Sequence, residues 1–267
     1  MSLLDRLDPK YRLILCDVWG VVHDGVRLYA GASERLHNWR TEGRCVALIT
    51  NAPRTAEAVE QQLARIGLEH GAYDFVVTSG EAGIEALKAL HEPVGFIGTK
   101  QDRTILEARD VQIALGEDFS NLACTGTIEG RPDPQDYRGD LERWSKRDVN
   151  MHCLNPDRVV VRGGVPEACA GALADIYEGL GGRVTWYGKP YEAIYRHALQ
   201  RAGEPPVGQV LAIGDGLQTD ILGAALMGFD AVFVSGGIHA GEPFPKDFAA
   251  LNGLGDWQPV AVVEGLL

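Results

Sequence analysis

Short runs of consecutive apolar residues recur along this chain of 267 residues, and longer stretches with helical spacing separate them. The first runs are Leu13–Cys16, Cys45–Ile49 and Phe75–Val77, and the spacing predicts helices over Ala32–Glu42 and Thr55–Ile66 between them. Strands that are apolar without polar alternation are buried on both faces of their sheet. Because helices cover both faces of such a sheet, this order predicts an α/β protein with a doubly wound parallel sheet.

The same order of elements returns in the last third of the chain. We predict strands over Val184–Tyr187, Val210–Ile213 and Ala231–Val234, with helices over Tyr191–Arg201 and Leu217–Met227 between them. Strands and helices that alternate in this way are typical of a parallel sheet. We therefore expect both ends of the chain to contribute strands to one core sheet.

The middle of the chain is more charged, and its pattern is less regular. We interpret residues 81–182 as a small α/β cap domain inserted into a core built from residues 1–80 and 183–267. One continuous large sheet is the alternative, but the tighter alternation on either side favours an insertion. The predicted elements of the insertion are helices over Glu81–Leu90, Gln135–Lys146 and Pro166–Leu180, and strands over Val94–Ile97, Asn121–Cys124 and Val159–Val161.

Charge excludes several classes of partner. Asp and Glu number 37 against 25 Lys and Arg, which gives a formal net charge of −12. Such a surface repels nucleic acid and anionic membranes, and no apolar run approaches the length of a membrane span. The N-terminal segment has early acids and no long apolar run, unlike a signal peptide. The five cysteines lie far apart without a C-x-x-C pair, which predicts reduced thiols in a cytoplasmic protein.

Polar residues stand directly after several of the predicted strands. Asp17 follows the first strand, Thr50 and Asn51 follow the second, Asp215 follows Val210–Ile213 by one glycine, and Lys189 follows Val184–Tyr187. Ligands of an open parallel sheet bind beyond the carboxyl ends of its strands. Each residue also has a structural explanation, because Asp often caps a helix and Thr-Asn often closes a turn.

Taken together, these strand ends offer two carboxylates, a hydroxyl, an amide and an ammonium group. Carboxylates are the ligands that Mg²⁺ prefers, and the cation, lysine and hydroxyl can hold a phosphoryl group. One carboxylate is then available to attack phosphorus and form an aspartyl-phosphate. The set therefore predicts chemistry on a small-molecule phosphate ester.

Four segments carry these residues in order along the chain: Asp17–Val22, Ile49–Asn51, Gly188–Pro190 and Gly214–Asp220. They resemble the motifs of the haloacid dehalogenase superfamily, and their surroundings resemble its class IIA branch of capped phosphatases. The resemblance implies a Mg²⁺-dependent phosphatase for a small cytosolic ester such as a sugar phosphate or nucleotide monophosphate. Members of that branch also act on pyridoxal phosphate and nitrophenyl phosphate.

The resemblance also implies a role for each residue of the metal site. Asp17 is the nucleophile and a Mg²⁺ ligand, and Trp19 offers its backbone carbonyl to the metal. Asp215 binds Mg²⁺ directly, whereas Asp220 supports the site without touching the metal.

The remaining roles concern the substrate. Thr50 and Asn51 hold the transferring phosphoryl group, and Lys189 screens the charge between Asp17 and the phosphate. The inserted cap covers the site and selects the leaving group, although its arginines are equally well explained as surface charge. The candidate contacts to the leaving group are Asn155, Asp157, Arg158 and Arg162.

One residue departs from the family pattern. Trp19 stands where the family has a second Asp, which protonates the leaving oxygen and later activates water. An indole does not titrate usefully, and general acid–base catalysis is worth about 10²–10⁴ in rate. His23 or Asp24 could replace the missing acid, the enzyme could be slow or restricted to activated esters, or the chain could bind a phosphate ligand without turnover. Trp19 could also form a hydrophobic wall that restricts substrate shape.

Two other enzyme classes fit less well. A dinucleotide-binding oxidoreductase would carry G-x-G-x-x-G after its first strand, and that motif is absent there. A dehalogenase proper needs no metal, which would leave Asp215 and Asp220 without a purpose. Exposed apolar strands of the cap could also pair two chains in a homodimer.

Overall fold

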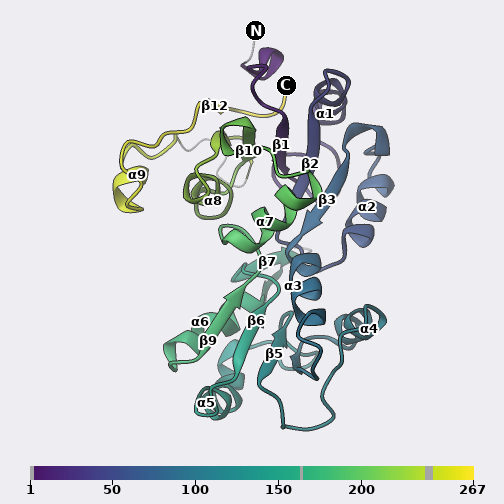
Figure 1. Ribbon diagram of the computed structural model, residues 1–267, viewed down its shortest axis with the longest axis vertical. Helices are drawn as coiled ribbons and strands as arrows, with labels where there is room; N and C mark the ends of the chain where they lie inside the picture. Colours follow the sequence, from purple (N-terminus) through teal and green to yellow (C-terminus); the bar gives the residue numbers. More distant parts are fainter. Residues whose placement is uncertain (1–2, 163–164, 238–242) are drawn as a thin grey trace. The chain divides into compact units, whose positions relative to one another are not determined.

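The computed structural model describes residues 3–162, 165–237 and 243–267, and the chain forms two compact units (Figure 1). The first unit comprises Met1–Thr50, Ala56–Val77 and Lys189–Leu267. The second comprises Asn51–Thr55 and Thr78–Gly188. Each unit has its own sheet, so each is described separately.

The first unit is built on a six-stranded sheet in the order β12-β11-β10-β1-β2-β3. Strand β1 pairs in parallel with β2 on one side and with β10 on the other. Every residue of β1 and β10 is buried, which explains why their sequences are apolar without alternation. The strands are β1 (Leu13–Asp17), β2 (Cys45–Thr50), β3 (Phe75–Thr78), β10 (Val210–Gly214), β11 (Asp230–Val234) and β12 (Ala261–Val263).

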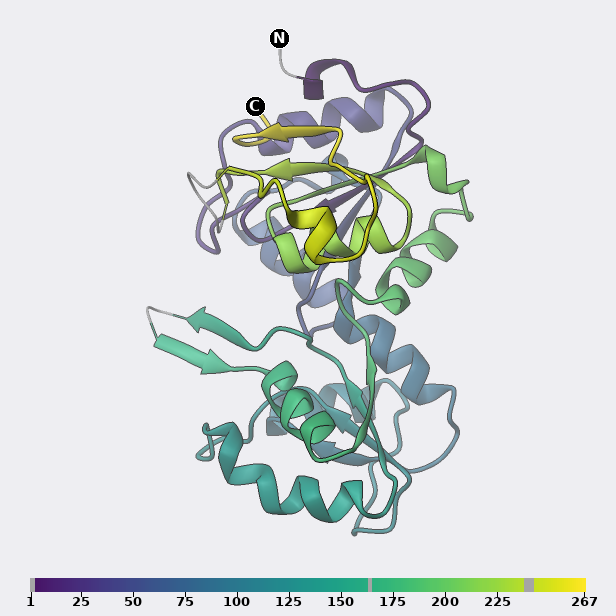
Figure 2. The same cartoon turned by 90° about the vertical axis from the view of Figure 1, so that its left-hand side faces the viewer.

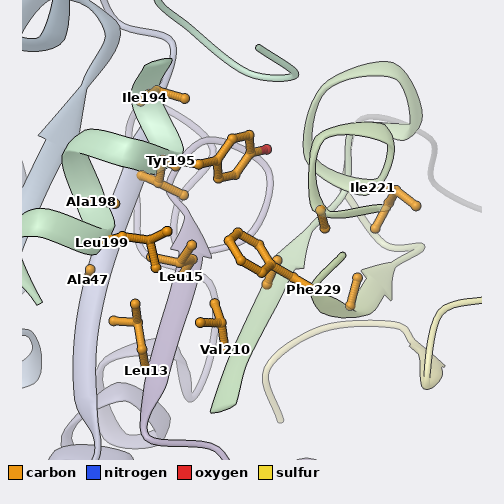
Figure 3. Close-up of a cluster of buried hydrophobic side chains, with 14 of the residues drawn as sticks. Leu13, Leu15, Ala47, Ile194, Tyr195, Ala198, Leu199, Val210, Ile221 and Phe229 are labelled. Atoms are coloured by element: carbon orange, nitrogen blue, oxygen red, sulfur yellow. The ribbon is translucent and has the colours of Figure 1, made fainter. Parts of the chain in front are cut away.

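Helices cover both faces of this sheet. Helix α1 lies on one side, and α8 and α9 lie on the other (Figure 2). On the second side, Leu13 and Leu15 of β1 pack in one cluster with α7 (Figure 3). In the same cluster the rings of Tyr195 and Phe229 meet edge to face, with their centres 5.9 Å apart. The helices are α1 (Ala32–Thr41), α2 (Ala56–Arg65), α7 (Glu192–Arg201), α8 (Leu222–Leu226) and α9 (Phe248–Leu251), and a π-helical turn, Leu217–Ile221, precedes α8.

The second unit has a four-stranded parallel sheet in the order β4-β5-β6-β9 and an antiparallel hairpin, β7-β8. Its own core joins α3, α4 and the sheet through residues such as Ile84, Leu106 and Ala123. The strands are β4 (Gly95–Ile97), β5 (Asn121–Cys124), β6 (Asn150–Cys153), β7 (Val159–Arg162), β8 (Val165–Ala168) and β9 (Arg183–Trp186). The helices are α3 (Ser79–Lys88), α4 (Lys100–Ala108), α5 (Arg138–Ser145) and α6 (Ala170–Gly179).

The predicted α/β class with parallel sheets is confirmed, and two element assignments are wrong. The strand expected over Val184–Tyr187 in the core sheet is β9, and it pairs with β6 of the second unit. An apolar run predicts a parallel strand but does not say which sheet it joins. The helix expected from Pro166 begins at Ala170, because Pro166 lies on β8 opposite Val161. In the described part of the chain, no helix is long and apolar enough to cross a membrane.

Candidate active site

Three buried aspartates gather at the carboxyl ends of two neighbouring strands of the first unit. Asp17 is the last residue of β1, Asp215 directly follows β10, and Asp220 lies in the π-helical turn after it. One carboxylate oxygen from each lies within 4.8 Å of the other two. The parallel pairing of β1 with β10 brings Asp17 and Asp215 to the same edge, as their positions after two strands predicted.

Lys189 lies against two of these carboxylates. Its ammonium group donates hydrogen bonds to Oδ1 of Asp17, to Oδ1 of Asp220 at 2.7 Å and to the Ile49 carbonyl at 3.4 Å. Burial alone would lower the pKa of Lys189, but Asp17 and Asp220 raise it well above its usual range. Burial and the carboxylates of Asp220 and Asp215 raise the pKa of Asp17 well above its usual range, and the Lys189 ammonium opposes this rise. Three carboxylates this close together favour the binding of a further positive charge.

Glycines leave the space that the Asp215 carboxylate fills. A Cβ atom on Gly20 would lie 2.1 Å from Oδ2 of Asp215, and one on Gly237 would lie 2.1 Å from the same oxygen. Gly20 has φ +89°, a left-handed conformation that favours glycine. The sequence interpretation gave neither glycine a role in the site, although Gly20 lies within the segment Asp17–Val22. Their positions could have pointed to the site, because Gly20 lies three residues after Asp17 and Gly237 lies shortly after β11.

Asp220 is held by its own turn as well as by Lys189. Its Oδ2 accepts hydrogen bonds from the Gly216 amide at 3.1 Å and from the Thr219 hydroxyl at 3.3 Å, while Oδ1 accepts from Lys189. Both oxygens of Asp220 are thus engaged within the protein. This arrangement suits a residue that positions Lys189 and the neighbouring carboxylates.

The predicted phosphoryl-binding residues fall on either side of the division between the units. Thr50 ends β2, directly after Ile49, which pairs with Asp17 of β1. Asn51 belongs to the second unit, where its Nδ2 donates to Oδ1 of Asp157 at 2.9 Å. The Asp157 amide in turn donates to Oδ1 of Asn155 at 3.1 Å. The structure thus brings Asn51, Asn155 and Asp157 together in one hydrogen-bonded group.

The two arginines proposed for the leaving group have different outcomes. The Arg158 guanidinium donates to both carboxylate oxygens of Asp175 of α6, at 2.8 and 3.0 Å, and to the Pro156 carbonyl at 2.9 Å. It also lies over the Trp186 ring, 5.2 Å from the ring centre. These contacts favour the alternative in which Arg158 is a structural surface charge. Arg162 lies on β7, and its side chain falls outside the described part of the structure.

Trp19 lies in the loop after β1, with 44% of the residue exposed. The six-membered half of its indole packs against Gly25, where a Cβ atom would lie 2.4 Å from Cη2. Its ring also meets His23 edge to face, with the ring centres 5.5 Å apart. The indole is therefore held in place on one side although much of it is open to solvent.

The two proposed substitutes for the missing acid, His23 and Asp24, are both engaged in folding this loop. His23 is buried, its Nδ1 accepts the Gly25 amide at 2.8 Å, and burial lowers its pKa. The exposed Asp24 carboxylate accepts the amides of Arg27 at 2.7 Å and Val26 at 2.8 Å, and these bonds lower its pKa. Both arrangements weigh against a role in proton transfer. That His23 or Asp24 replaces the missing acid stays a prediction.

Comparisons with known proteins agree with this architecture. A family model described as haloacid dehalogenase-like hydrolase matches residues 14–112, and a second, HAD-hydrolase-like model matches residues 186–266. A crystal structure of a hydrolase of the haloacid dehalogenase-like family from Brucella suis 1330 is 35% identical, covers 99% of this chain and 98% of that one, and has a TM-score of 0.82.

Two further similar proteins carry names of phosphatases. Ribonucleotide monophosphatase NagD from Escherichia coli strain K12 is 28% identical over 230 residues, which are 85% of this chain and 88% of NagD. The p-nitrophenyl phosphatase from Archaeoglobus fulgidus is similar in fold, with a TM-score of 0.76, 20% identity and 97% of each chain covered.

Proposed function

The chain belongs to the haloacid dehalogenase superfamily, in its class IIA branch, and is a hydrolase; we propose that it hydrolyses a small phosphate monoester with Asp17 as nucleophile. The observation that carries the proposal is the buried group of Asp17, Asp215 and Asp220 around Lys189. The names of the two similar phosphatases support the same reaction class.

The aspartate group fits a magnesium ion. Three buried carboxylates within 4.8 Å of one another offer hard oxygen ligands, and their mutual repulsion favours a cation between them. We propose that Asp17, Asp215 and the Trp19 carbonyl hold the ion and that Asp220 supports them. When bound, the ion would offset charge on the phosphoryl oxygens.

Asp17, Thr50, Asn51 and Lys189 have the chemistry that phosphoryl transfer needs. An oxygen of Asp17 forms a bond to phosphorus while the bond to the leaving oxygen breaks, and that oxygen keeps the electron pair. Thr50 and Asn51 donate hydrogen bonds to the transferring group, and Lys189 balances its charge. Water then attacks phosphorus, the bond to Asp17 breaks, and phosphate is released.

We also propose that the second unit is the cap that selects the leaving group. It carries the Asn51–Asp157–Asn155 hydrogen-bonded group, which begins one residue after Thr50. The direct chain connection from Thr50 to Asn51 supports this role, because one dipeptide then contributes to both units.

A binding protein without turnover is the second candidate. Trp19 in place of an acid favours it, together with the engagement of His23 and Asp24 in their own loop. Such a protein would hold a phosphate ligand at the same residues and release no product.

Hydrolysis of p-nitrophenyl phosphate separates these two candidates. We expect Mg²⁺-dependent release of nitrophenolate that stops on chelation and that falls by more than about 10³-fold in Asp17→Asn. Asp118→Asn makes the same change at an exposed site of the second unit and should keep the wild-type rate. Equal inactivity of wild type and Asp17→Asn on every ester, with phosphate still bound, would replace the phosphatase by the binding protein.

A further inference from the structure

We infer that Ser79 is a positioning residue of the proposed phosphatase. It holds Asn51, the proposed phosphoryl ligand, beside the loop Asn155–Asp157, so that phosphoryl binding and leaving-group recognition depend on each other. The inference rests on the proposed function, to which it adds this residue. Its starting point is a short excursion of the chain, because Asn51–Thr55 belongs to the second unit although the residues on both sides of it belong to the first.

Ser79 contacts both the segment 51–55 and the chain that leads into the loop. It is the first residue of α3 and is completely buried. Its Oγ lies 2.7 Å from the carbonyl oxygen of Asn51, 2.7 Å from that of Leu154 and 3.2 Å from that of Ala52. A serine hydroxyl carries one proton, so it donates to one of these carbonyls at a time. The Asn51 segment and the start of the loop therefore share one buried donor.

The residues on either side of this serine fix the same segment. The Thr78 hydroxyl donates to the Arg54 carbonyl at 2.6 Å, and the Gly80 amide donates to the Ala52 carbonyl at 3.2 Å. A Cβ atom on Gly80 would lie 2.5 Å from the carbonyl carbon of Pro53, which is closer than a side chain allows. These contacts bind the short segment to the second unit at three successive residues.

The loop itself is anchored to the sheet and to a helix of the second unit. The Leu154 amide donates to the Cys124 carbonyl of β5 at 2.9 Å, and the Gly171 amide of α6 donates to the Asp157 carbonyl at 3.1 Å. The Asp157 carboxylate in turn accepts a hydrogen bond from Nδ2 of Asn51 at 2.9 Å. The loop region therefore reaches Asn51 in two ways, through the shared hydroxyl and through this carboxylate.

The shared proton gives this serine a role that a methyl group cannot replace. Two carbonyl oxygens that face one hydroxyl repel each other, and the proton between them offsets that repulsion. In Ser79→Ala the repulsion between the Asn51 and Leu154 carbonyls remains without the proton, so Asn51 should move away from the loop. Asn51 donates to the transferring group in the proposed mechanism, and a displacement of about 1 Å in such a group can cost about 10²-fold in rate.

A double-mutant cycle with Asn51 tests this role. We propose measuring kcat and KM for nitrophenyl phosphate at saturating Mg²⁺ with wild type, Ser79→Ala, Asn51→Ala and the double variant. Ser79→Ala should lower kcat about 10–100-fold and change KM less than about twofold, because the lost interaction stabilises the transition state. In the Asn51→Ala background the same substitution should cost less than about threefold, since the group that it positions is absent.

Tyr177→Phe is the matched control, because it removes another buried hydroxyl of the second unit. Tyr177 is completely buried, and its hydroxyl donates to the Val149 carbonyl at 2.6 Å. Val149 precedes β6 and Leu154 follows it, so the two carbonyls lie at opposite ends of that strand. Both Ser79→Ala and Tyr177→Phe should lower the urea midpoint, since each removes a buried hydrogen bond, but only Ser79→Ala should lower kcat.

Two kinetic results would overturn the inference. An unchanged kcat in Ser79→Ala would show that the hydroxyl does not position Asn51. Loss of kcat by the same factor in the wild-type and Asn51→Ala backgrounds would make Ser79 a residue of general stability.

Inactivity of wild type, matched by Asp17→Asn, would remove the phosphatase but still leave the positioning role open to measurement. The four proteins of the cycle are then compared by their dissociation constants for inorganic phosphate with Mg²⁺, measured by calorimetry. A loss of affinity in Ser79→Ala that disappears in the Asn51→Ala background would support the positioning role in a binding protein. Additive losses, or no binding of phosphate by wild type, would overturn it.

Discussion

A single hydrogen atom on Gly20 leaves the space that the Asp215 carboxylate occupies. Gly20→Ala would place a methyl group 2.1 Å from Oδ2 of Asp215, at a φ of +89°. Gly43→Ala is the matched control, because Gly43 has φ +85° and no atom within 4 Å of its Cβ position. Each substitution should lower the free energy of unfolding by about 1–2 kcal/mol through backbone strain.

Only Gly20→Ala should weaken the metal site. Displacing Asp215 should raise the Mg²⁺ concentration needed for half-maximal stabilisation about 10–100-fold, measured as the shift of the urea midpoint with added Mg²⁺. Gly43→Ala should respond to Mg²⁺ as wild type does. An unchanged Mg²⁺ response in Gly20→Ala would mean that Asp215 does not hold the ion.

At the scale of single residues, the sequence predicts which residues lie close together, but not the hydrogen-bond partners of each one. Asp17 and Asp215 were predicted to meet because strand ends in a parallel sheet converge, and they lie together. Lys189 also meets Asp17, although it follows β9, a strand of the other sheet. Arg158 and His23 were proposed for the site, yet their hydrogen bonds go to Asp175 and to the Gly25 amide. Such partners depend on local backbone geometry, which residue type and spacing do not specify.

Within the second unit, a buried histidine links three strands of the sheet. His152 of β6 lies 2.8 Å from Oδ1 of Asn121 of β5 and 2.7 Å from the Tyr187 hydroxyl, just after β9. When Nε2 carries the proton it donates to the Asn121 oxygen, and Nδ1 then accepts from the Tyr187 hydroxyl. Burial lowers the pKa of His152 to about 4, and folding therefore requires the neutral ring.

This linkage predicts a loss of stability in mild acid. Above about pH 6.5 both folded and unfolded His152 are neutral, whereas between pH 6.5 and 4 only the unfolded state binds the proton. Wild type should lose about 3 kcal/mol more of its unfolding free energy between pH 7 and pH 4 than His152→Gln, in urea titrations. His91→Gln, at an exposed site, should keep the wild-type slope; parallel curves for wild type and His152→Gln would exclude the linkage.

The sequence predicted which segments are strands better than it predicted which sheet each strand joins. The strands with continuous apolar runs were recognised because burial on both faces removes polar alternation. Strand β6, Asn150–Cys153, was missed because its sequence mixes polar and apolar residues, and Asn150 and His152 serve the buried network. Strand β9 was recognised but placed in the wrong sheet, because its pairing with β6 is a long-range property of the fold.

At the scale of the whole molecule, the alternation of strands and helices was enough to predict the α/β class. The chain passes between the two units four times, after Thr50, Thr55, Val77 and Gly188. The sequence interpretation placed the return to the core near residue 183, earlier than the division at Gly188. The sequence does not mark the division, because Val184, Trp186 and Tyr187 continue the alternation of apolar strands and helices.

The division into two units lets us predict which of them bound Mg²⁺ stabilises. The aspartate group and Lys189 belong entirely to the first unit, so Mg²⁺ should stabilise that unit by mass action. At about 100 times its dissociation constant the gain is about 2.7 kcal/mol. Hydrogen exchange should then slow about 100-fold for core amides of β1 and β10, such as those of Ile14 and Leu211, in exchange limited by global opening of that unit.

Amides of the second sheet provide the internal control for this measurement. Leu122 and Met151 pair across β5 and β6, far along the chain from any of the three aspartates, and should slow much less when Mg²⁺ is added. Asp215→Asn should remove the effect in the first unit, because it replaces a charged oxygen ligand by a neutral amide. Equal slowing in both sheets would show that the two units unfold as one, and slowing in the second sheet alone would place the ion away from Asp17. If Mg²⁺ slows hydrogen exchange only in the first unit, the carboxylates at the ends of β1 and β10 bind the ion, and not the acidic surface in general.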